Sequence, residues 1–348
     1  MTTTDSRLLL ELYALATPEW WERATPGDDW AQKEQAMAPD QLRPRAYAGE
    51  RDLRAIVELL LSAQAAEPAF DWPGAGQLRA LLADPAFDRA RDLRLWVDAR
   101  GALVACALLW AGNTLLWFSR PAARGEALDA LVVAWGASRA REMAAPGDRI
   151  TLRTEARDPQ TQRIASLRRL GFVRQSDHAL RMRRALAESL AGHRAPAGYR
   201  IRPLAEGELG AWLALAGELF PQATRLPLSV GRRRALMADA AYTPDLDLVA
   251  EAESGALVGF CHVALRPDER ERLGRRAGWI ELLGVAPAQR GAGLGRALLR
   301  TGLLALADYG ADEALLTVRA DNTAAQALYA AEGFITLHAE RTWTLTLD

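Results

Sequence analysis

The sequence contains almost no lysine and shows no excess of either charge. Lys33 is its one lysine, so arginine supplies nearly all of the positive charge, and 43 basic against 44 acidic side chains leave a net charge of −1. Proteins that follow nucleic-acid phosphates gather a basic excess on one face, so we expect no nucleic-acid partner. An apolar content of 50% also excludes an intrinsically disordered chain.

Cysteine is equally scarce, which excludes a fold held together by disulfides. The two cysteines, Cys106 and Cys261, both lie inside apolar runs, and no basic region followed by a signal-like apolar core stands near Met1. These features predict a reduced, cytoplasmic protein. With 348 residues the chain is long enough for two domains, each with its own core.

One uncharged segment, Gly101 to Ser119, is long enough to cross a membrane. Its centre, residues 111–114 (Ala-Gly-Asn-Thr), has the composition of a turn, and β-branched and aromatic residues flank that turn. This pattern favours two buried strands joined as a hairpin over a membrane-spanning helix, so we expect no membrane association.

The second half of the sequence repeats the first half with an offset of roughly 160 residues. Residues 121–125 and 287–291 both read Pro-Ala-x-Arg-Gly and open a long helix, while Gly-Phe at residues 171–172 and 333–334 is typical of a left-handed cap that ends one. Each half reads as a strand, one or two helices, antiparallel strands, a helix, a strand, a helix and final strands. This order predicts an α/β fold with a mixed, mostly antiparallel sheet between helices on both faces.

The repeat also sets the predicted domain boundaries. Residues 1–42 lie outside it and form an N-terminal helical extension, because apolar residues recur there at helical spacing. Residues 43–186 form the first domain, residues 187–198 a linker, and residues 199–348 the second domain.

The strongest chemical signal is the segment Gly284 to Leu299, in which a buried strand runs into a glycine-rich turn and then into a helix. Glycine lets backbone N–H groups approach an anion closely, and a helix N-terminus adds partial positive charge, so the segment suits a pyrophosphate. The Gly-Lys-Ser/Thr sequence of an ATP-binding P-loop is absent, and the glycine spacing differs from that of the dinucleotide-binding fingerprint.

A second motif lies downstream and runs from Asn322 to Phe334. Together the two motifs resemble the signatures of the GNAT superfamily of acetyl-CoA-dependent N-acetyltransferases. The first matches Arg/Gln-x-x-Gly-x-Gly/Ala at Arg290, Gly293 and Gly295, and the second matches Asn-x-x-Ala-x-x-Leu-Tyr-x-x-x-Gly-Phe. The resemblance covers about 150 residues of the second half and, more faintly, the first half, which is similar to the layout of tandem two-domain members.

The resemblance implies an enzyme that moves acetyl directly from acetyl-CoA to a primary amine, with no metal and no covalent enzyme intermediate. It implies that backbone N–H groups of Gly284 and Val285 hold the thioester carbonyl, and that Tyr329 donates a proton to the departing thiolate. The cofactor-binding residues that it implies are Gly284, Val285, Gln289, Arg290, Gly291, Ala292, Gly293, Leu294, Gly295, Arg296, Asn322 and Ala325.

Transfer to an amine also needs a group that removes the amine proton. Glu281 is the first candidate, because it stands in an apolar strand where alternation places it on one face with Trp279 and Leu283. A carboxylate in apolar surroundings is suited to take up a proton near neutral pH. Two alternatives stay open: the Glu281 side chain simply points to water, or His262 on the preceding strand is the base.

The first half lacks the residues that carry these functions. Ala127 and Asp129 stand at the positions of Gly293 and Gly295, and the aspartate would repel a pyrophosphate. Leu167 stands at the position of Tyr329, and Gln160 stands at the position of Asn322. We therefore expect a degenerate first domain that supports the active second domain and forms one wall of the acceptor site.

The sequence leaves three points open. A non-catalytic acyl-CoA sensor or scaffold, or a transferase that uses another acyl-CoA, would share the glycine motif. The acceptor is a small-molecule or peptide amine, and residues 220–228 and 338–343 are where the family sets its specificity. The protein is expected to be a monomer or a homodimer.

Overall fold

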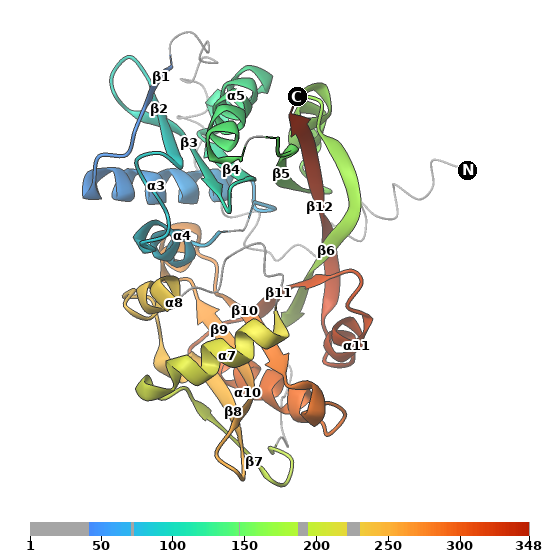
Figure 1. Cartoon of the computed structure of the whole chain (residues 1–348). Coiled ribbons are helices and arrows are strands. Elements are labelled where there is room, and N and C mark those ends of the chain that lie inside the picture. Colours follow the sequence, from blue (N-terminus) through green and yellow to red (C-terminus); the bar gives the residue numbers. More distant parts are fainter. Residues whose placement is uncertain (1–41, 71–72, 146, 187–193, 221–229, 348) are drawn as a thin grey trace, which may run out of the picture.

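One continuous sheet runs through both halves of the chain (Figure 1). The computed structural model describes residues 42–70, 73–145, 147–186, 194–220 and 230–347. Within these residues the strand order is β1-β2-β3-β4-β5-β12-β6-β11-β10-β9-β8-β7. The strands are β1 (Arg43–Arg45), β2 (Leu93–Val97), β3 (Leu103–Trp110), β4 (Thr114–Ser119), β5 (Ile150–Arg157), β6 (Val173–Ala185), β7 (Tyr199–Pro203), β8 (Asp247–Ala252), β9 (Leu257–Leu265), β10 (Ala277–Val285), β11 (Glu313–Arg319) and β12 (Ile335–Leu347).

Helices cover both faces of this sheet, which confirms the predicted fold class. The α-helices are α3 (Glu50–Ala66), α4 (Ala75–Ala83), α5 (Glu126–Met143), α6 (Thr161–Arg169), α7 (Leu209–Leu219), α8 (Val230–Met237), α9 (Pro267–Leu273), α10 (Leu294–Asp308) and α11 (Thr323–Ala331). Short 3₁₀ turns are η2 (Pro121–Ala123), η3 (Glu206–Glu208), η4 (Pro244–Leu246) and η5 (Pro287–Gln289).

Strand alternation gives the first half two separate cores. Cys106 and Leu108 of β3 face α3 and α4, whereas Ala107 and Leu109 of the same strand face α5 and α6. Each set lies in a cluster of fully buried side chains. The strand is buried on both faces, which explains why its sequence is an uninterrupted apolar run.

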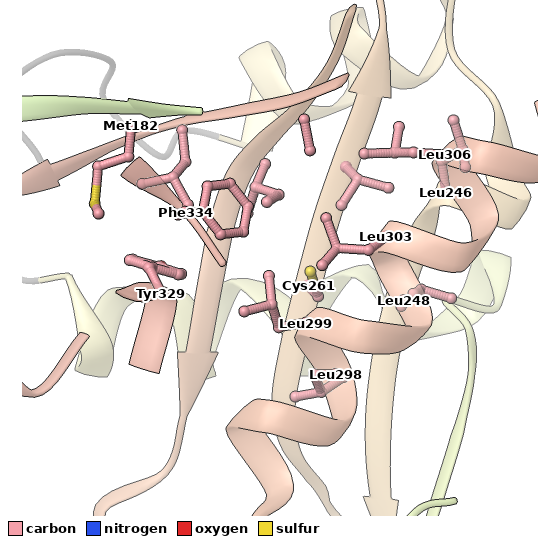
Figure 2. Packing of buried hydrophobic residues seen from close by; sticks show 14 of the residues in the cluster. Met182, Leu246, Leu248, Cys261, Leu298, Leu299, Leu303, Leu306, Tyr329 and Phe334 are labelled. Carbon is pink, nitrogen blue, oxygen red and sulfur yellow. The ribbon is translucent and has the colours of Figure 1, made fainter. Parts of the chain in front are cut away.

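The second half has the same two-layer arrangement. On one face α7 packs Trp212 against Phe260 of β9, with ring centroids 5.0 Å apart. On the other face α10 and α11 pack against β8 to β11, and Figure 2 shows Leu299 and Leu303 of α10 close to Cys261 of β9. Leucine recurs along α10 at helical spacing, so one stripe of the helix is buried.

The last strand of each half is exchanged between the halves. β12 pairs antiparallel with β5 of the first half, from Glu340↔Arg157 to Leu347↔Ile150. β6 in turn pairs antiparallel with β11 of the second half over Glu313↔Ala185 to Arg319↔Ala179. The two exchanged strands also pair with each other and run side by side between the halves in Figure 1. The sheet therefore has no break between the repeats.

Two local predictions are confirmed. The uncharged segment forms the hairpin of β3 and β4, which turns at Ala111 and Gly112 with positive φ of 48° and 76°. Gly171 and Gly333 end α6 and α11 with positive φ of 84° and 81°, as left-handed helix caps require. In the part of the chain that the structure describes, no helix has both the length and the apolar character of a membrane span.

The predicted domain boundaries stay a prediction. Residues 1–41 of the predicted N-terminal extension (residues 1–42) and residues 187–193 of the predicted linker lie outside the described residues. The strand exchange means that residues 43–186 and 199–348 each contribute one strand to the other half of the sheet.

The exchange generates a prediction about stability. Arg157 of β5 and Glu340 of β12 form an ion pair of 2.7 Å with side chains only 3% and 1% exposed. We expect Glu340→Ala to lower the free energy of unfolding by about 3–5 kcal/mol, because it leaves a buried arginine without its carboxylate. Urea denaturation measures this loss.

The control is the apolar double variant Arg157→Met/Glu340→Leu, which removes both charges and should lose less than the single variant. A loss below about 1 kcal/mol for Glu340→Ala would show that the exchanged strand does not depend on this pair.

Candidate active site

The central feature of the site is the point where two parallel strands separate. β10 and β11 pair from Ala277↔Glu313 to Ile280↔Leu316 and no further, while β10 stays paired with β9 as far as Val285. The backbone of β10 after Ile280 therefore has a free edge on the β11 side. The free edge lies in the strand where the family resemblance implies that backbone N–H groups of Gly284 and Val285 hold the thioester carbonyl.

The glycine loop follows this strand and leads into α10. Gly291 and Gly293 have positive φ of 85° and 80°, and Gly293 is the N-cap residue of α10. The Arg290 Nε donates to the Val285 carbonyl oxygen at 3.1 Å, which fixes the loop against the end of β10. The loop thus presents backbone at the positive end of a helix of 15 residues.

Gly284 is needed for a different reason, since no side chain fits there. A Cβ at this position would lie 2.7 Å from Leu219 Cδ1 and 3.3 Å from the Phe260 ring. An apolar wall therefore lies directly against the separated part of β10, where the thioester was predicted to sit.

Asn322 and Tyr329 take different places around α11. Asn322 caps the helix, because its Oδ1 accepts from the Ala325 N–H at 3.1 Å, and it also lines the cavity described below. Tyr329 is 7% exposed and packs edge-on against Phe334, with ring centroids 5.7 Å apart (Figure 2). Burial raises the pKa of the Tyr329 hydroxyl above its ordinary value, so this group holds its proton. Its role as proton donor stays a prediction.

A cavity of about 670 Å³ opens beside the separated strands and has walls from both halves of the chain. The second half contributes Trp279, Glu281 and Leu282 of β10 and residues of α7, α8 and β9. The first half contributes α4, through Gln77 and its neighbours, and the strand exchange brings in residues of β5, β6 and β12. The first half therefore forms one wall of this cavity, and its role in binding the acceptor stays a prediction.

Ion pairs hold α4 over the cavity. Arg79 of α4 contacts Asp239 at 2.6 Å and Asp268 at 3.0 Å, both in the second half. Gly74, at the start of α4, lies against the Arg266 side chain so closely that a Cβ would be 2.6 Å from its Nε. These contacts fix the position of α4 relative to the cavity.

Glu281 does not have the apolar surroundings that were predicted. Its Oε2 accepts from Gln77 Nε2 at 2.6 Å, and its Oε1 lies 3.3 Å from Arg266 Nη2. The Arg266 guanidinium stacks over Trp279 at 3.5 Å from the ring centroid. Glu281 lines the cavity and does not simply point to water, but both of its oxygens already have partners.

Leu283 does not lie on the face of β10 that was predicted for it, because the strand contains a β-bulge. The pairing of β10 with β9 shifts by one residue between Ile280 and Leu282. After the bulge, Leu282 packs toward α7, while Leu283 packs with Ile280 in the α10 cluster. An extra residue in one strand reverses the alternation, so the simple period-two count failed here.

A group that the sequence did not reveal lies at the inner wall of the cavity. Asp247 at the start of β8 is fully buried, and its Oδ1 lies 3.4 Å from Nδ1 of His262. Its Oδ2 accepts from the Tyr242 hydroxyl at 2.7 Å and from Arg233. Burial opposes ionisation of Asp247, but His262, Arg233 and Tyr242 outweigh it and hold its pKa at about 2. The register of β8 with β9 places Asp247 opposite His262, while Arg233 comes from α8 and Tyr242 from the segment that follows it.

The corresponding site in the first half is filled by its own side chains. β4 and β5 also separate, since they pair only at Thr114↔Arg153. The guanidinium of Arg163 lies 3.8 Å from the Trp117 ring centroid and donates to the Glu155 carbonyl oxygen at 3.1 Å. It thus bridges the two separated strands. The repeat places Arg163 where the second half has Ala325, and Trp117 where it has Leu283.

Asp129 also has side-chain partners in the region between β4 and β5. It occupies the position of Gly295 in the repeat, and its carboxylate accepts from Trp117 Nε1 at 2.7 Å and from the Ser166 hydroxyl at 2.5 Å. Gln160, at the position of Asn322, accepts from the Arg157 N–H at 2.9 Å. The residues that replace the family motif have structural partners of their own.

Comparison with known proteins agrees with this fold and these motifs. Residues 216–334 match the sequence model of the acetyltransferase (GNAT) family, so the second half of the chain holds a GNAT domain. A tandem GNAT protein from the clavulanic acid biosynthesis pathway is 20% identical with a TM-score of 0.65, over 88% of this chain and 98% of that one. A GCN5-related N-acetyltransferase from Sphaerobacter thermophilus is 24% identical with a TM-score of 0.63, over 89% and 97%. The chain therefore has the tandem GNAT fold.

A curated relative gives a more specific similarity. The chain is 36% identical over 181 residues to the mycothiol acetyltransferase of Thermobispora bispora, which covers 51% of this chain and 59% of the relative. The chain thus spans about three fifths of the length of the curated relatives that it matches first.

The filled site generates a prediction about Asp129. Asp129→Ala leaves the Trp117 indole N–H and the Ser166 hydroxyl without their acceptor, so we expect a loss of about 1–3 kcal/mol in the free energy of unfolding. Glu126→Ala on the same helix is the matched control, because its ion pair with Arg169 is half exposed and should contribute less than about 1 kcal/mol. Equal losses for the two variants in urea denaturation would contradict a structural role for Asp129.

Proposed function

We propose that the chain is an N-acyltransferase that moves acetyl from acetyl-CoA to a primary amine of a small molecule, with one active site in its second half. The observation that carries this proposal is the separation of β10 from β11 after Ile280, in the strand that leads into the glycine loop and beside a cavity of about 670 Å³. The family match and the name of the curated relative support acyl transfer.

The glycine loop suits the pyrophosphate of the acyl donor. A side chain built at Gly291 or Gly293 would meet no atom within 4 Å, so the backbone of the loop faces open space. Accessible N–H groups at a helix N-terminus are the partners that a pyrophosphate needs. We assign this contact to the segment Gln289, Arg290, Gly291, Ala292, Gly293, Leu294, Gly295 and Arg296.

The proposed chemistry needs three contributions beyond binding. Backbone N–H groups of Gly284 and Val285 hold the thioester carbonyl, and a preorganised donor of this kind is commonly worth about 2.7–4 kcal/mol in the transition state. Asn322 and Ala325 contact the donor near the thioester. Tyr329 supplies a proton to the departing thiolate, and burial keeps its hydroxyl protonated before that step because it raises the pKa of this group.

A non-catalytic acyl-CoA sensor would need the glycine loop but no acceptor site. The cavity beside the separated strands, with Trp279 and Leu282 on its wall, favours a bound acceptor and therefore turnover. The buried free thiols of Cys106 and Cys261 support a reducing compartment, and we place the reaction in the cytoplasm. We propose no nucleic-acid or membrane partner, and a monomer or a homodimer.

Calorimetric titration followed by a thiol-release assay tests the proposal. We expect the wild-type protein to bind one equivalent of acetyl-CoA, because the first half fills its own site. The assay then offers amino acids, amino sugars, polyamines and short peptides, with acetyl-, propionyl- and succinyl-CoA as donors. The panel includes the amine that acetylation converts to mycothiol, since the curated relatives carry that name.

The outcomes separate the possible functions. One equivalent with release of thiol supports the proposal, and Tyr329→Phe should then keep its acetyl-CoA affinity while turnover falls at least about tenfold. Binding with no turnover on any amine would favour the sensor, and no binding would contradict both. Two equivalents would contradict the single site.

A charge placed in the loop tests where the pyrophosphate lies. Gly295→Asp copies the residue of the first half, and a carboxylate about 4 Å from a phosphate costs about 4 kcal/mol near a protein surface, so we expect the acetyl-CoA affinity to fall at least about 100-fold. Gly295→Asn has nearly the same size without the charge. A Cβ at this position makes ordinary contacts of 3.7 Å with Val285 and 3.8 Å with Leu328, so both variants should fold. Equal affinities of the two variants would show that the pyrophosphate lies elsewhere.

A further inference from the structure

His262 and Asp247 form a buried pair whose open end is the cavity. His262 is 4% exposed and lines the cavity, and its Nδ1 lies 3.4 Å from Asp247 Oδ1. The two residues are direct partners in the antiparallel pairing of β9 with β8. Two strands of the core therefore hold the pair in place, and neither group sits on a loop.

The surroundings of Asp247 leave one of its oxygens for the imidazole. Oδ2 accepts from the Tyr242 hydroxyl and from Arg233, and Oδ1 is the oxygen that faces His262. An ionised carboxylate can only accept, so it favours the tautomer with the proton on Nδ1. The lone pair is then on Nε2, the other ring nitrogen of a residue that lines the cavity. The Tyr242 ring lies nearly parallel to the imidazole, at an interplanar angle of 25° and 6.3 Å between centroids.

The pair also lies at the right place in the sheet. His262 pairs across β9 and β10 with Leu282, and Gly284 follows two residues later on the separated edge. Glu281 is nearer in sequence, but Gln77 and Arg266 occupy both of its carboxylate oxygens. Their positions make Glu281 part of the contact between the two halves of the chain.

We propose that Nε2 of His262 takes the proton from the acceptor amine, and that Asp247 positions the ring for this step. This inference rests on the proposed acyl transfer. The acceptor enters as an ammonium ion and gives one proton to Nε2. The free nitrogen lone pair then forms the bond to the thioester carbonyl carbon, and the carbon–sulfur bond breaks with its electron pair on sulfur. Tyr329 gives its proton to that sulfur and takes up the second nitrogen proton in its place, the third stays on the amide, and His262 returns its proton to solvent.

The tautomer of His262 is measurable without any substrate. Long-range ¹H–¹⁵N spectra of the ¹⁵N-labelled full-length protein, with His262→Gln to assign the signals, resolve the imidazoles of its four histidines. At a pH where the ring is neutral, we expect a protonated Nδ1 and an unprotonated Nε2 in the wild type. Asp247→Asn, which keeps the shape but can donate, should lose this preference. An Nε2–H tautomer in the wild type would overturn the proposal even if Asp247→Asn did not fold.

Kinetics then test the role in transfer, with the amine that the wild type acetylates fastest. We expect His262→Gln to lower kcat by about 10²–10⁴ while its acetyl-CoA affinity stays within about twofold, because a general base contributes to chemistry and not to donor binding. Asp247→Asn should lower kcat at least about tenfold, and Tyr242→Phe, which keeps the stacked ring, should lose less than either.

Glu281→Gln is the competing variant and should lose less kcat than His262→Gln. The reverse order would assign the base to Glu281 and overturn the proposal while the acyltransferase function stands. A wild type that binds acetyl-CoA but acetylates no amine would overturn the proton-transfer role together with the proposed function, whatever the tautomer.

Discussion

The pairing of β12 with β5 and of β6 with β11 is the constraint on which the rest of the structure depends. Backbone hydrogen bonds of the sheet fix the two repeats at one relative position, because each repeat supplies a strand to the other. The buried pair of Arg157 and Glu340 lies in the same exchanged strand. Because the repeats are fixed in this way, α4 of the first half lies against β10 of the second half, and Gln77 donates a hydrogen bond to Glu281. The cavity is therefore a product of both repeats.

The same separation of parallel strands has opposite outcomes in the two halves. In the second half Ala325, Leu283 and Gly295 are small or apolar, so none of them has a polar side chain that could bridge β10 and β11. In the first half Arg163 and Trp117 stand at two of these positions and cross the gap between β4 and β5. A gap between separated strands leaves backbone N–H and C=O groups unpaired in the sheet, so these groups need a ligand, side chains or water as partners. In the first half the side chains themselves occupy the gap between β4 and β5, so no space is left there for a ligand.

Much of the fold could be predicted from the sequence, because local rules decided it. The hairpin turn at Ala111 and Gly112, the glycine caps at Gly171 and Gly333, and the glycine loop before α10 each follow from the conformational freedom of a few residues. The repeat then extended these assignments from one half to the other. The cofactor residues and Tyr329 came from a resemblance, and their roles are still proposals.

The parts that the sequence did not predict all depend on register or on long-range pairing. The bulge in β10 moved Leu283 to the other face, and no residue type in Trp279 to Leu283 marks a bulge. The exchange of β6 and β12 joins residues that lie between 128 and 197 positions apart in the sequence, and periodicity cannot show which half a strand pairs with. For the same reason Asp247 and His262 looked unrelated, and Glu281 was expected to lie among apolar neighbours when Arg266 and Gln77 in fact hold it.

The most direct test of a single site shared by two repeats is a crystal structure with a non-hydrolysable acetyl-CoA analogue. The account predicts one analogue per chain, with its pyrophosphate at the loop before α10, its acyl group at the separated edge of β10, and Arg163 still between β4 and β5. Density for a second analogue between β4 and β5, with Arg163 displaced, would contradict it.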